Sequence, residues 1–178
     1  MRSRALTSLS AFSNVPWVVT FVAAIAIAIV MVMALSLLAI RAPLLEPPGI
    51  GVRLGLYLRT NTAQTGAAAV LPELAPLILL GDNKTALHAL EQAGRELGWH
   101  EVTIDTTNSQ LRAVVISAVF RFRDDLYIRL LARGAQRTEA LVRSSSRVGR
   151  GDLGANVHHI VALRDVLTRR SQLAEDAQ

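Results

Sequence analysis

An uninterrupted apolar segment near the start constrains this chain more than any other feature of its sequence. From Val18 to Ile40 no side chain is charged, and Thr20 and Ser36 are the only polar interruptions. With a rise of about 1.5 Å per residue, a helix of this length crosses a hydrocarbon layer about 30 Å thick. A helix also satisfies its own backbone hydrogen bonds there. We therefore predict a transmembrane helix over residues 16–40.

Two other interpretations of this segment stay open at the level of sequence, a cleavable signal peptide and a buried core helix. The apolar region of a signal peptide usually has about 7–15 residues and ends in a small-x-small site. Here the run is longer, and Ala34-Leu35-Ser36 is the only passable site. The length favours an anchor that is retained.

The charges that flank the segment nearly balance. Arg2 and Arg4 precede it, whereas Arg41, Arg53 and Arg59 follow it. A short basic head before a first helix ordinarily stays inside the cell, so we expect the C-terminal part of the chain outside.

Composition excludes several classes of function. Lys84 is the only lysine, and the arginines after residue 80 alternate with acidic residues, so no single-sign stripe follows a nucleic-acid backbone. Aromatic residues make up 4% of the chain, too few to stack bases. The chain has no cysteine, which excludes disulfides, thiolate nucleophiles and Cys-ligated zinc. We expect no nucleic-acid partner.

Proline and glycine divide the remainder of the chain. Pro43, Pro47, Pro48 and Gly49 prevent a continuous helix beyond the apolar segment. The residues from Val52 to Leu58 alternate poorly, and they fit either the membrane surface or the surface of a domain. The predicted organisation is a basic head at 1–15, the helix at 16–40, a linker at 41–71, a domain at 72–170 and a polar tail at 171–178.

Periodicity within the domain predicts two helices and an antiparallel sheet. Asp82 or Asn83 caps a helix with helically spaced apolar residues, and Gly98 closes it. Alternating segments joined by turns are typical of a meander. The predicted strands cover 77–80, 99–105, 111–122, 126–131 and 140–147, and the predicted helices cover 83–97 and 154–170. The order β-α-β-β-β-β-α predicts an α+β two-layer domain, with an antiparallel four- to five-stranded sheet and two helices on one face.

Three ordered motifs resemble one protein family. They are Leu97-Gly98-Trp99, Phe122-Arg123-Asp124-Asp125, and the long run from Arg143 to Asn156, which reads RSSSRVGRGDLGAN. These resemble the bacterial and plastid family called domain of unknown function 1499, over Pro72 to about Leu167. The linker is similar too, in Pro47-Pro48-Gly49, in LYLRTN from Leu56 and in Pro72-Glu73-Leu74. The resemblance implies no established reaction. It implies a fold unit that recurs on signal peptides, lipid anchors and membrane helices, and hence a single-pass protein of a bacterial inner membrane with its domain on the periplasmic side.

The long motif contains a glycine pattern that occurs in phosphate-binding loops. Gly149, Gly151 and Gly154 satisfy G-x-G-x-x-G between a predicted strand and a predicted helix. However, no second parallel strand follows, and Asp152 is placed to cap the helix itself. Dinucleotide binding, a small-anion site and a purely structural turn with an Arg–Asp lattice are the alternatives, and the pattern favours the last. The candidate binding or structural residues are Asp124, Arg143, Arg147, Arg150, Asp152 and Asn156.

No catalytic set, metal site or cofactor is predicted. Asp124 and Asp125 are adjacent on a strand, so at most one of them enters a given site. His158 and His159 are neighbours on a helix and cannot chelate one metal as an i, i+4 pair would. Ser144, Ser145 and Ser146 lack the context of a nucleophile elbow.

Three functions are therefore weighed. The favoured one is a membrane-tethered, non-catalytic binding or assembly domain that docks on a membrane protein partner. The alternatives are a lipid or small-anion binder and, with less support, a hydrolase that uses Asp124 or Asp152.

Overall fold

The computed structural model describes residues 17–117 and 121–176. The chain separates into two compact units, residues 1–36 and residues 37–178. The basic head predicted at 1–15 lies outside the described residues.

The first unit contains most of α1 (Trp17–Ala39), a 23-residue helix. It is long and apolar enough to cross a membrane, by length and composition. At about 1.5 Å per residue it measures about 35 Å, slightly more than the hydrocarbon thickness of a bilayer.

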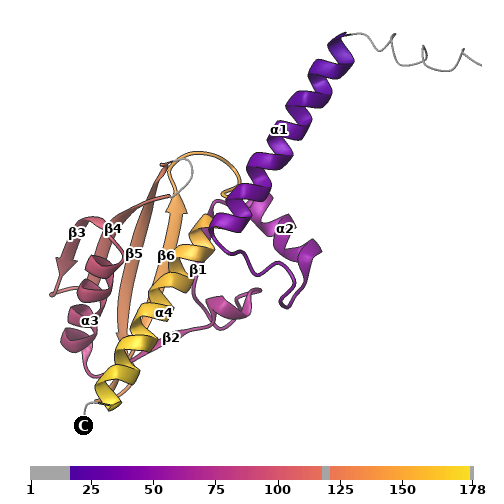
Figure 1. Ribbon diagram of the computed structural model, residues 1–178. Coiled ribbons are helices and arrows are strands. Elements are labelled where there is room, and N and C mark those ends of the chain that lie inside the picture. The colour runs from indigo at the N-terminus through magenta and orange to yellow at the C-terminus, as the bar shows by residue number, and fades with distance from the viewer. Residues whose placement is uncertain (1–16, 118–120, 177–178) are drawn as a thin grey trace, which may run out of the picture. The chain divides into compact units, whose positions relative to one another are not determined.

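The second unit is an α+β domain of two layers, as predicted (Figure 1). Its strands are β1 (Thr62–Gln64), β2 (Leu77–Leu80), β3 (His100–Asp105), β4 (Gln110–Ile116), β5 (Arg123–Ala132) and β6 (Arg137–Ser146). Its helices are α2 (Ile50–Arg59), the 3₁₀ turn η1 (Pro72–Leu74), α3 (Asn83–Glu96) and α4 (Ala155–Asp176).

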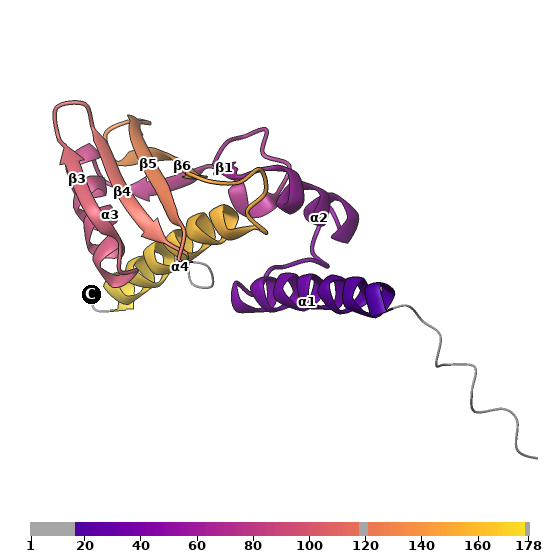
Figure 2. The same ribbon diagram turned by 90° about the horizontal axis from the view of Figure 1, so that it is seen from above.

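All strand pairs are antiparallel, in the order β1-β6-β5-β4-β3, with β2 also paired to β6 (Figure 2). β3 to β6 form the predicted meander. β1 and β2 pair with successive parts of the same edge of β6, at residues 143–145 and 137–140. The sheet thus has six strands, more than the four or five predicted.

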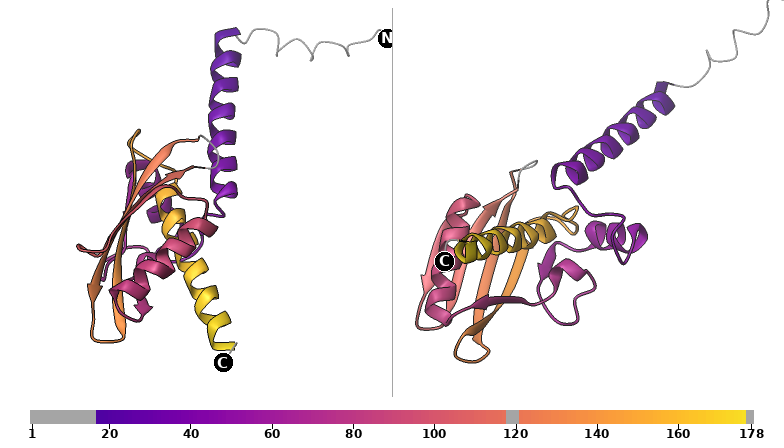
Figure 3. Two further views of the ribbon diagram at one scale, coloured as in Figure 1. Left: turned by 90° about the vertical axis from the view of Figure 1, so that its left-hand side faces the viewer. Right: turned by 60° about the horizontal axis from the view of Figure 1, so that its bottom comes forward.

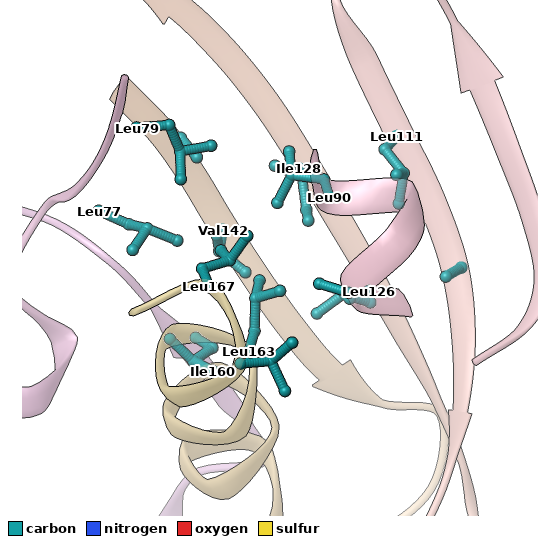
Figure 4. Packing of buried hydrophobic residues seen from close by; sticks show 14 of the residues in the cluster. Leu77, Leu79, Leu90, Leu111, Leu126, Ile128, Val142, Ile160, Leu163 and Leu167 are labelled. Atoms are coloured by element: carbon teal, nitrogen blue, oxygen red, sulfur yellow. The ribbon is translucent and has the colours of Figure 1, made fainter. Parts of the chain in front are cut away.

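The helices α3 and α4 cover one face of the sheet (Figure 3). Inward-facing residues of β2, β4, β5 and β6 meet the apolar stripes of both helices in a single core (Figure 4). Ile128, Leu90 and Leu163 are fully buried at its centre. The apolar stripe of α4 is buried except for the partly exposed Val161.

The Leu97-Gly98-Trp99 motif closes α3 and packs on it. Gly98 takes a positive φ of 67°, and Trp99 is buried. A Cβ on Gly94 would lie 2.5 Å from the Trp99 ring, so the ring needs the bare backbone of the helix beneath it.

The strand predicted over 111–122 is shorter in the structure. β4 ends at Ile116, and Arg121 has a positive φ of 57°, which an extended strand does not allow. The amide of Phe122 donates to the Ser117 hydroxyl, which closes a turn. The part of this prediction at 118–120 lies outside the described residues.

The segment expected to be a linker, 41–71, contributes α2 and β1 to the domain. Tyr57 and Ala63 belong to the core, so the packed unit begins well before Pro72. β1 has only three residues and no apolar run, and its position depends on pairing with β6. That long-range contact has no local sequence signal. At the other end, α4 continues through the predicted tail to Asp176.

Candidate functional site

Asn156, one of the predicted site residues, lies in the first turn of α4 and forms the centre of a hydrogen-bond network. Its amide nitrogen lies within hydrogen-bond distance of three acceptors, the Asn61 carbonyl at 2.9 Å, the Ser146 hydroxyl at 2.8 Å and the Asp152 carboxylate at 2.6 Å. Its amide oxygen accepts from the Ser144 hydroxyl at 2.6 Å. Asn156 is fully buried. Its side chain therefore ties α4 to β6 and to the chain entering β1, and its hydrogen bonds are all internal.

Asp152 caps α4, as its position predicts. Its two carboxylate oxygens accept from the backbone N–H groups of Gly154 at 2.8 Å and Asn156 at 3.0 Å. These are among the groups that a phosphate would use at a helix N-terminus. A carboxylate already holds them, so an anion at this point would meet a like charge.

Two of the three glycines of the motif, Gly151 and Gly154, allow the loop to pack against the end of α2. A Cβ on Gly151 would lie 2.3 Å from the carbonyl oxygen of Leu58, and Gly154 has a φ of 86° against the Tyr57 ring. The N–H groups of Asp152 and Leu153 donate to the carbonyls of Thr60 and Tyr57. The motif thus satisfies carbonyls at the C-terminal end of a helix, which would otherwise have no partner.

The arginines of the motif do not converge. Arg147 pairs with Asp125 at 2.6 Å on the surface, which lowers the pKa of that carboxyl. Arg143 lies on the open face of the sheet, opposite Tyr127 in the register. Arg150 is exposed in the loop. Within the described chain, neither Arg143 nor Arg150 forms an ion pair. The Arg–Asp lattice is therefore one pair, and it uses Asp125 rather than Asp124.

Asp124 points to the opposite face from Asp125 and is 1% exposed. Burial raises its pKa, and the nearby Ser146 hydroxyl opposes this only in part. His159 Nδ1 lies 3.8 Å from the carboxylate, and burial lowers the pKa of this imidazole to about 4. At neutral pH the histidine is therefore uncharged.

Ser144, His159 and Asp124 are the residue types of a catalytic triad, but their geometry differs from one. The Ser144 hydroxyl lies 3.2 Å from His159 Nδ1, the same ring nitrogen that faces Asp124. A triad needs the hydroxyl at one ring nitrogen and the carboxylate at the other. Ser144 is also fully buried, so no substrate reaches it. The sequence did not reveal this cluster. The available signal was the three-residue spacing of Asn156 and His159. It places both side chains on one face of α4, the face that meets the inward side of β6.

A pocket of about 560 Å³ lies near these residues. It is lined by residues 40–43, 46 and 47, by α2, by η1 and by the first turns of α4, including Val157, His158 and Val161. Its volume is in the range typical of small-molecule sites. Burial lowers the pKa of His158, so this side chain offers a hydrogen bond but little charge at neutral pH.

Arg53 and Glu73 form a buried ion pair at the wall of this pocket. Arg53 is 1% exposed, and its two terminal nitrogens bind the Glu73 carboxylate at 2.5 and 3.0 Å. It also donates to the carbonyls of Glu46 and Pro47 and to the Tyr57 hydroxyl. Burial raises the pKa of Glu73, but the hydrogen bond from Arg53, a backbone hydrogen bond and the charge of Arg53 together outweigh it, and the net pKa is lowered.

The sequence prediction missed this pair, since both residues lay outside the predicted domain or at its first turn. A lone arginine in the otherwise apolar run IGVRLGLYL was the available signal.

A family model described as "Protein of unknown function (DUF1499)" matches residues 58–167. This is more than half of the chain, and it includes every strand of the sheet, the glycine loop and the buried part of α4. The chain belongs to this family. The region that matches the DUF1499 family starts at the end of α2 and does not include α1. No curated protein matches the chain.

Proposed function

We propose that this DUF1499 protein is a membrane-tethered binding domain that carries out no chemistry of its own. The observation that carries the proposal is the pocket of about 560 Å³, which is lined from residue 40 onward and so begins directly after the last residue of α1. If α1 spans a bilayer, the covalent chain alone keeps this pocket near the membrane surface.

The anchor is the first part of the proposal. α1 has no acidic residue in its first turn and no basic residue in its last, and its length matches the hydrocarbon layer. We propose a bacterial inner membrane with the domain on the periplasmic side. Arg53 is sequestered by Glu73, so it contributes less than a free arginine to the charge after the helix. This favours retention of the head that bears Arg2 and Arg4 inside the cell.

The ligand class is the second part. The lining is mostly aliphatic, with proline and valine side chains, and the guanidinium of Arg53 has its donors engaged within the protein. Arg41, the other arginine of the lining, is exposed, so among the described residues an anion would find no unpaired buried cation there. An apolar ligand such as a lipid chain, with one hydrogen bond to His158, fits this wall better.

Catalysis has less support. A hydrolase would use Asp124 or Asp152, but the first is buried beneath α4 and the second holds the amides that cap this helix. A water-activating carboxylate needs access to a substrate.

Native mass spectrometry of the full chain, released from lipid nanodiscs, tests the proposal. We expect a lipid adduct on the wild type. In Val161→Trp, whose side chain fills the pocket, the fraction of protein that carries the adduct should fall at least about tenfold. Val148→Trp is the matched control, because Val148 is 67% exposed in the loop. An adduct retained equally in both variants, or absent from the wild type, would contradict the proposal.

Assembly with a membrane protein is the second candidate, supported by the open face of the sheet. There Arg112 lies over the Tyr127 ring at 5.6 Å, and Arg143 is opposite the same tyrosine on the other side. Two arginines beside an aromatic ring suit an acidic protein surface. A photo-crosslinking residue at position 127 tests this in intact membranes, and recovery of no repeated partner would count against it.

A further inference from the structure

The helix α2 exposes aliphatic side chains to solvent, whereas its buried side chains are polar. Its buried positions are Arg53 and Tyr57, which are polar or bear a polar group. The aliphatic residues Ile50, Val52 and Leu58 are each about half exposed, at 53%, 45% and 45%. A surface helix of a soluble domain ordinarily has the reverse arrangement.

This inverted arrangement is set by the buried ion pair. Arg53 reaches inward to Glu73 and to two backbone carbonyls of the preceding loop, and Tyr57 packs beneath the glycine loop. These contacts fix the rotation of the helix about its axis. At 100° per residue, Gly51, Gly55 and Leu58 then lie on the side of α2 away from Arg53 and Tyr57, with Val52 beside them.

Gly51 and Gly55 lie between Val52 and Leu58 on that side and add no polar side chain to it. Leu45, in the loop before the helix, is 89% exposed. Ile50, in the first turn of α2, is exposed as well. Together Leu45, Ile50, Val52 and Leu58 form what we term the outer aliphatic face. Patches of this kind on a soluble protein mark a binding surface.

The covalent chain indicates what covers the outer aliphatic face. Ten residues, 40–49, separate the end of α1 at Ala39 from the start of α2 at Ile50. Fully extended, this connection reaches about 40 Å at most. Its internal hydrogen bonds, such as Glu46 to Pro43 and Gly49 to Glu46, make it shorter. A helix held so near a membrane span is within reach of the headgroup layer.

The charges at the ends of this segment agree with a membrane. Arg41 and Arg59 are exposed before and after the outer aliphatic face, and no acidic residue lies within α2. Glu46, also exposed, is the one acidic residue in the connection over 40–49. Arginines near a bilayer surface bind anionic headgroups, with about 1 kcal/mol for each cation. An aliphatic face between cations is typical of a helix that lies in the interface.

We propose that α2 lies in the membrane interface with its outer aliphatic face in the acyl boundary, so that the domain rests on the bilayer through this helix. The proposal rests on the membrane tether of the proposed function. Its ligand is the lipid surface itself, and it does not require that the pocket be occupied.

Single cysteines test the proposal, because the chain has none of its own. The full chain in nanodiscs would carry an environment-sensitive NBD label at Ile29→Cys in α1, at Ile50→Cys, at Leu58→Cys or at Val148→Cys. All four positions are exposed, so folding should be retained, and unchanged thermal unfolding verifies this. Quenching by doxyl groups on the lipid chains is then measured.

We expect strong quenching at position 29, at least about half of that quenching at positions 50 and 58, and less than a tenth of it at position 148. Quenching at 29 without quenching at 50 and 58 would overturn the membrane contact of α2 and leave the tether intact. A blue-shifted but unquenched label at 50 and 58 indicates a protein partner or a second copy, and it too would overturn the inference. Absence of quenching at 29 would refute the tether itself, and the inference with it.

Discussion

Two helices of the same domain, α2 and α3, bury opposite kinds of side chain. α3 buries Ala86, Leu87 and Leu90 against the sheet, and Arg95 on its outer side is 68% exposed in a pair with Glu91. α2 buries Arg53 and exposes Ile50 and Leu58. The first helix separates an apolar core from water. The second separates a polar internal site from surroundings that suit aliphatic side chains.

The difference teaches that burial and polarity have to be considered together. α2 contributes little to the core beyond Tyr57, so its docking depends on a charge pair and on backbone contacts with the glycine loop. The stability of the domain should therefore be sensitive to the loss of one charge in α2. In water, it should be insensitive to substitutions on the outer aliphatic face. The following experiments test this contrast.

The largest effect is expected from Arg53→Met. It leaves Glu73, whose side chain is 17% exposed, without its partner, and loss of one member of a buried pair costs about 3–5 kcal/mol. The free energy of unfolding is measured by urea titration of Trp99 fluorescence in a Trp17→Phe background. Arg95→Met on α3 is the control, with a change below about 0.5 kcal/mol because its pair is exposed. Equal losses in the two variants would refute the contrast.

The next effect concerns pH. The folded pKa of His159 is about 4, below the unfolded value of about 6.5, so the unfolded chain binds the additional proton between these values. The contribution of His159 to the free energy of unfolding is fully present above pH 6.5. It falls as the pH drops toward 4, by about 3 kcal/mol in all. Asp124, whose pKa is raised by burial, titrates in the opposite sense and offsets part of this loss at the acid end.

His159→Gln removes the titrating group. We expect the slope of unfolding free energy between pH 6.5 and 4 to become smaller, even if the variant is less stable at every pH. A slope equal to that of the wild type would show that His159 does not cause it.

Gly151→Ala should have an intermediate effect. Its Cβ would lie 2.3 Å from a backbone carbonyl of α2, so the loop and the helix must separate, at a cost of about 1–3 kcal/mol. Gly51→Ala is the matched control, because a Cβ there meets nothing within 4 Å. Alanine in an exposed helix position should stabilise slightly, by about 0.5–1 kcal/mol. Thermal unfolding of both variants in the same detergent checks the difference in sign.

The smallest effect on folding is expected from Ile50→Ser combined with Leu58→Ser. Both positions are exposed, so the domain in detergent should lose less than about 1 kcal/mol. Leu87→Ser in α3 is the contrasting variant, since a buried leucine replaced by a small side chain costs about 2–5 kcal/mol. A large loss in the α2 double variant would mean that its outer aliphatic face packs within the domain.

Much of the fold was predictable because its signals are local. The cap at Asp82, the stripe of α3 and the glycine stop gave that helix its bounds, and the alternation in β5 and β6 placed Asp124 and Asp125 on opposite faces. The cap at Asp152 was predicted from its position before the helix, and the structure confirms it.

The parts that were missed depend on partners distant in sequence. β1 is defined by pairing with residues about 80 positions later, and Arg53 by Glu73 and by the loop before it. The packing of the glycine motif on α2 needed the same knowledge, because a G-x-G-x-x-G pattern does not reveal whether a phosphate or a carbonyl approaches it. Side-chain pairs across a fold leave little trace in local periodicity.

Photo-crosslinking in native membranes tests the central claim most directly. A benzophenone amino acid is placed at position 58 on α2 or at position 95 on α3, each in the full chain, and the adducts are weighed after irradiation. The account predicts lipid adducts at position 58 and none at position 95. Protein adducts at position 58, or equal lipid adducts at both positions, would contradict it.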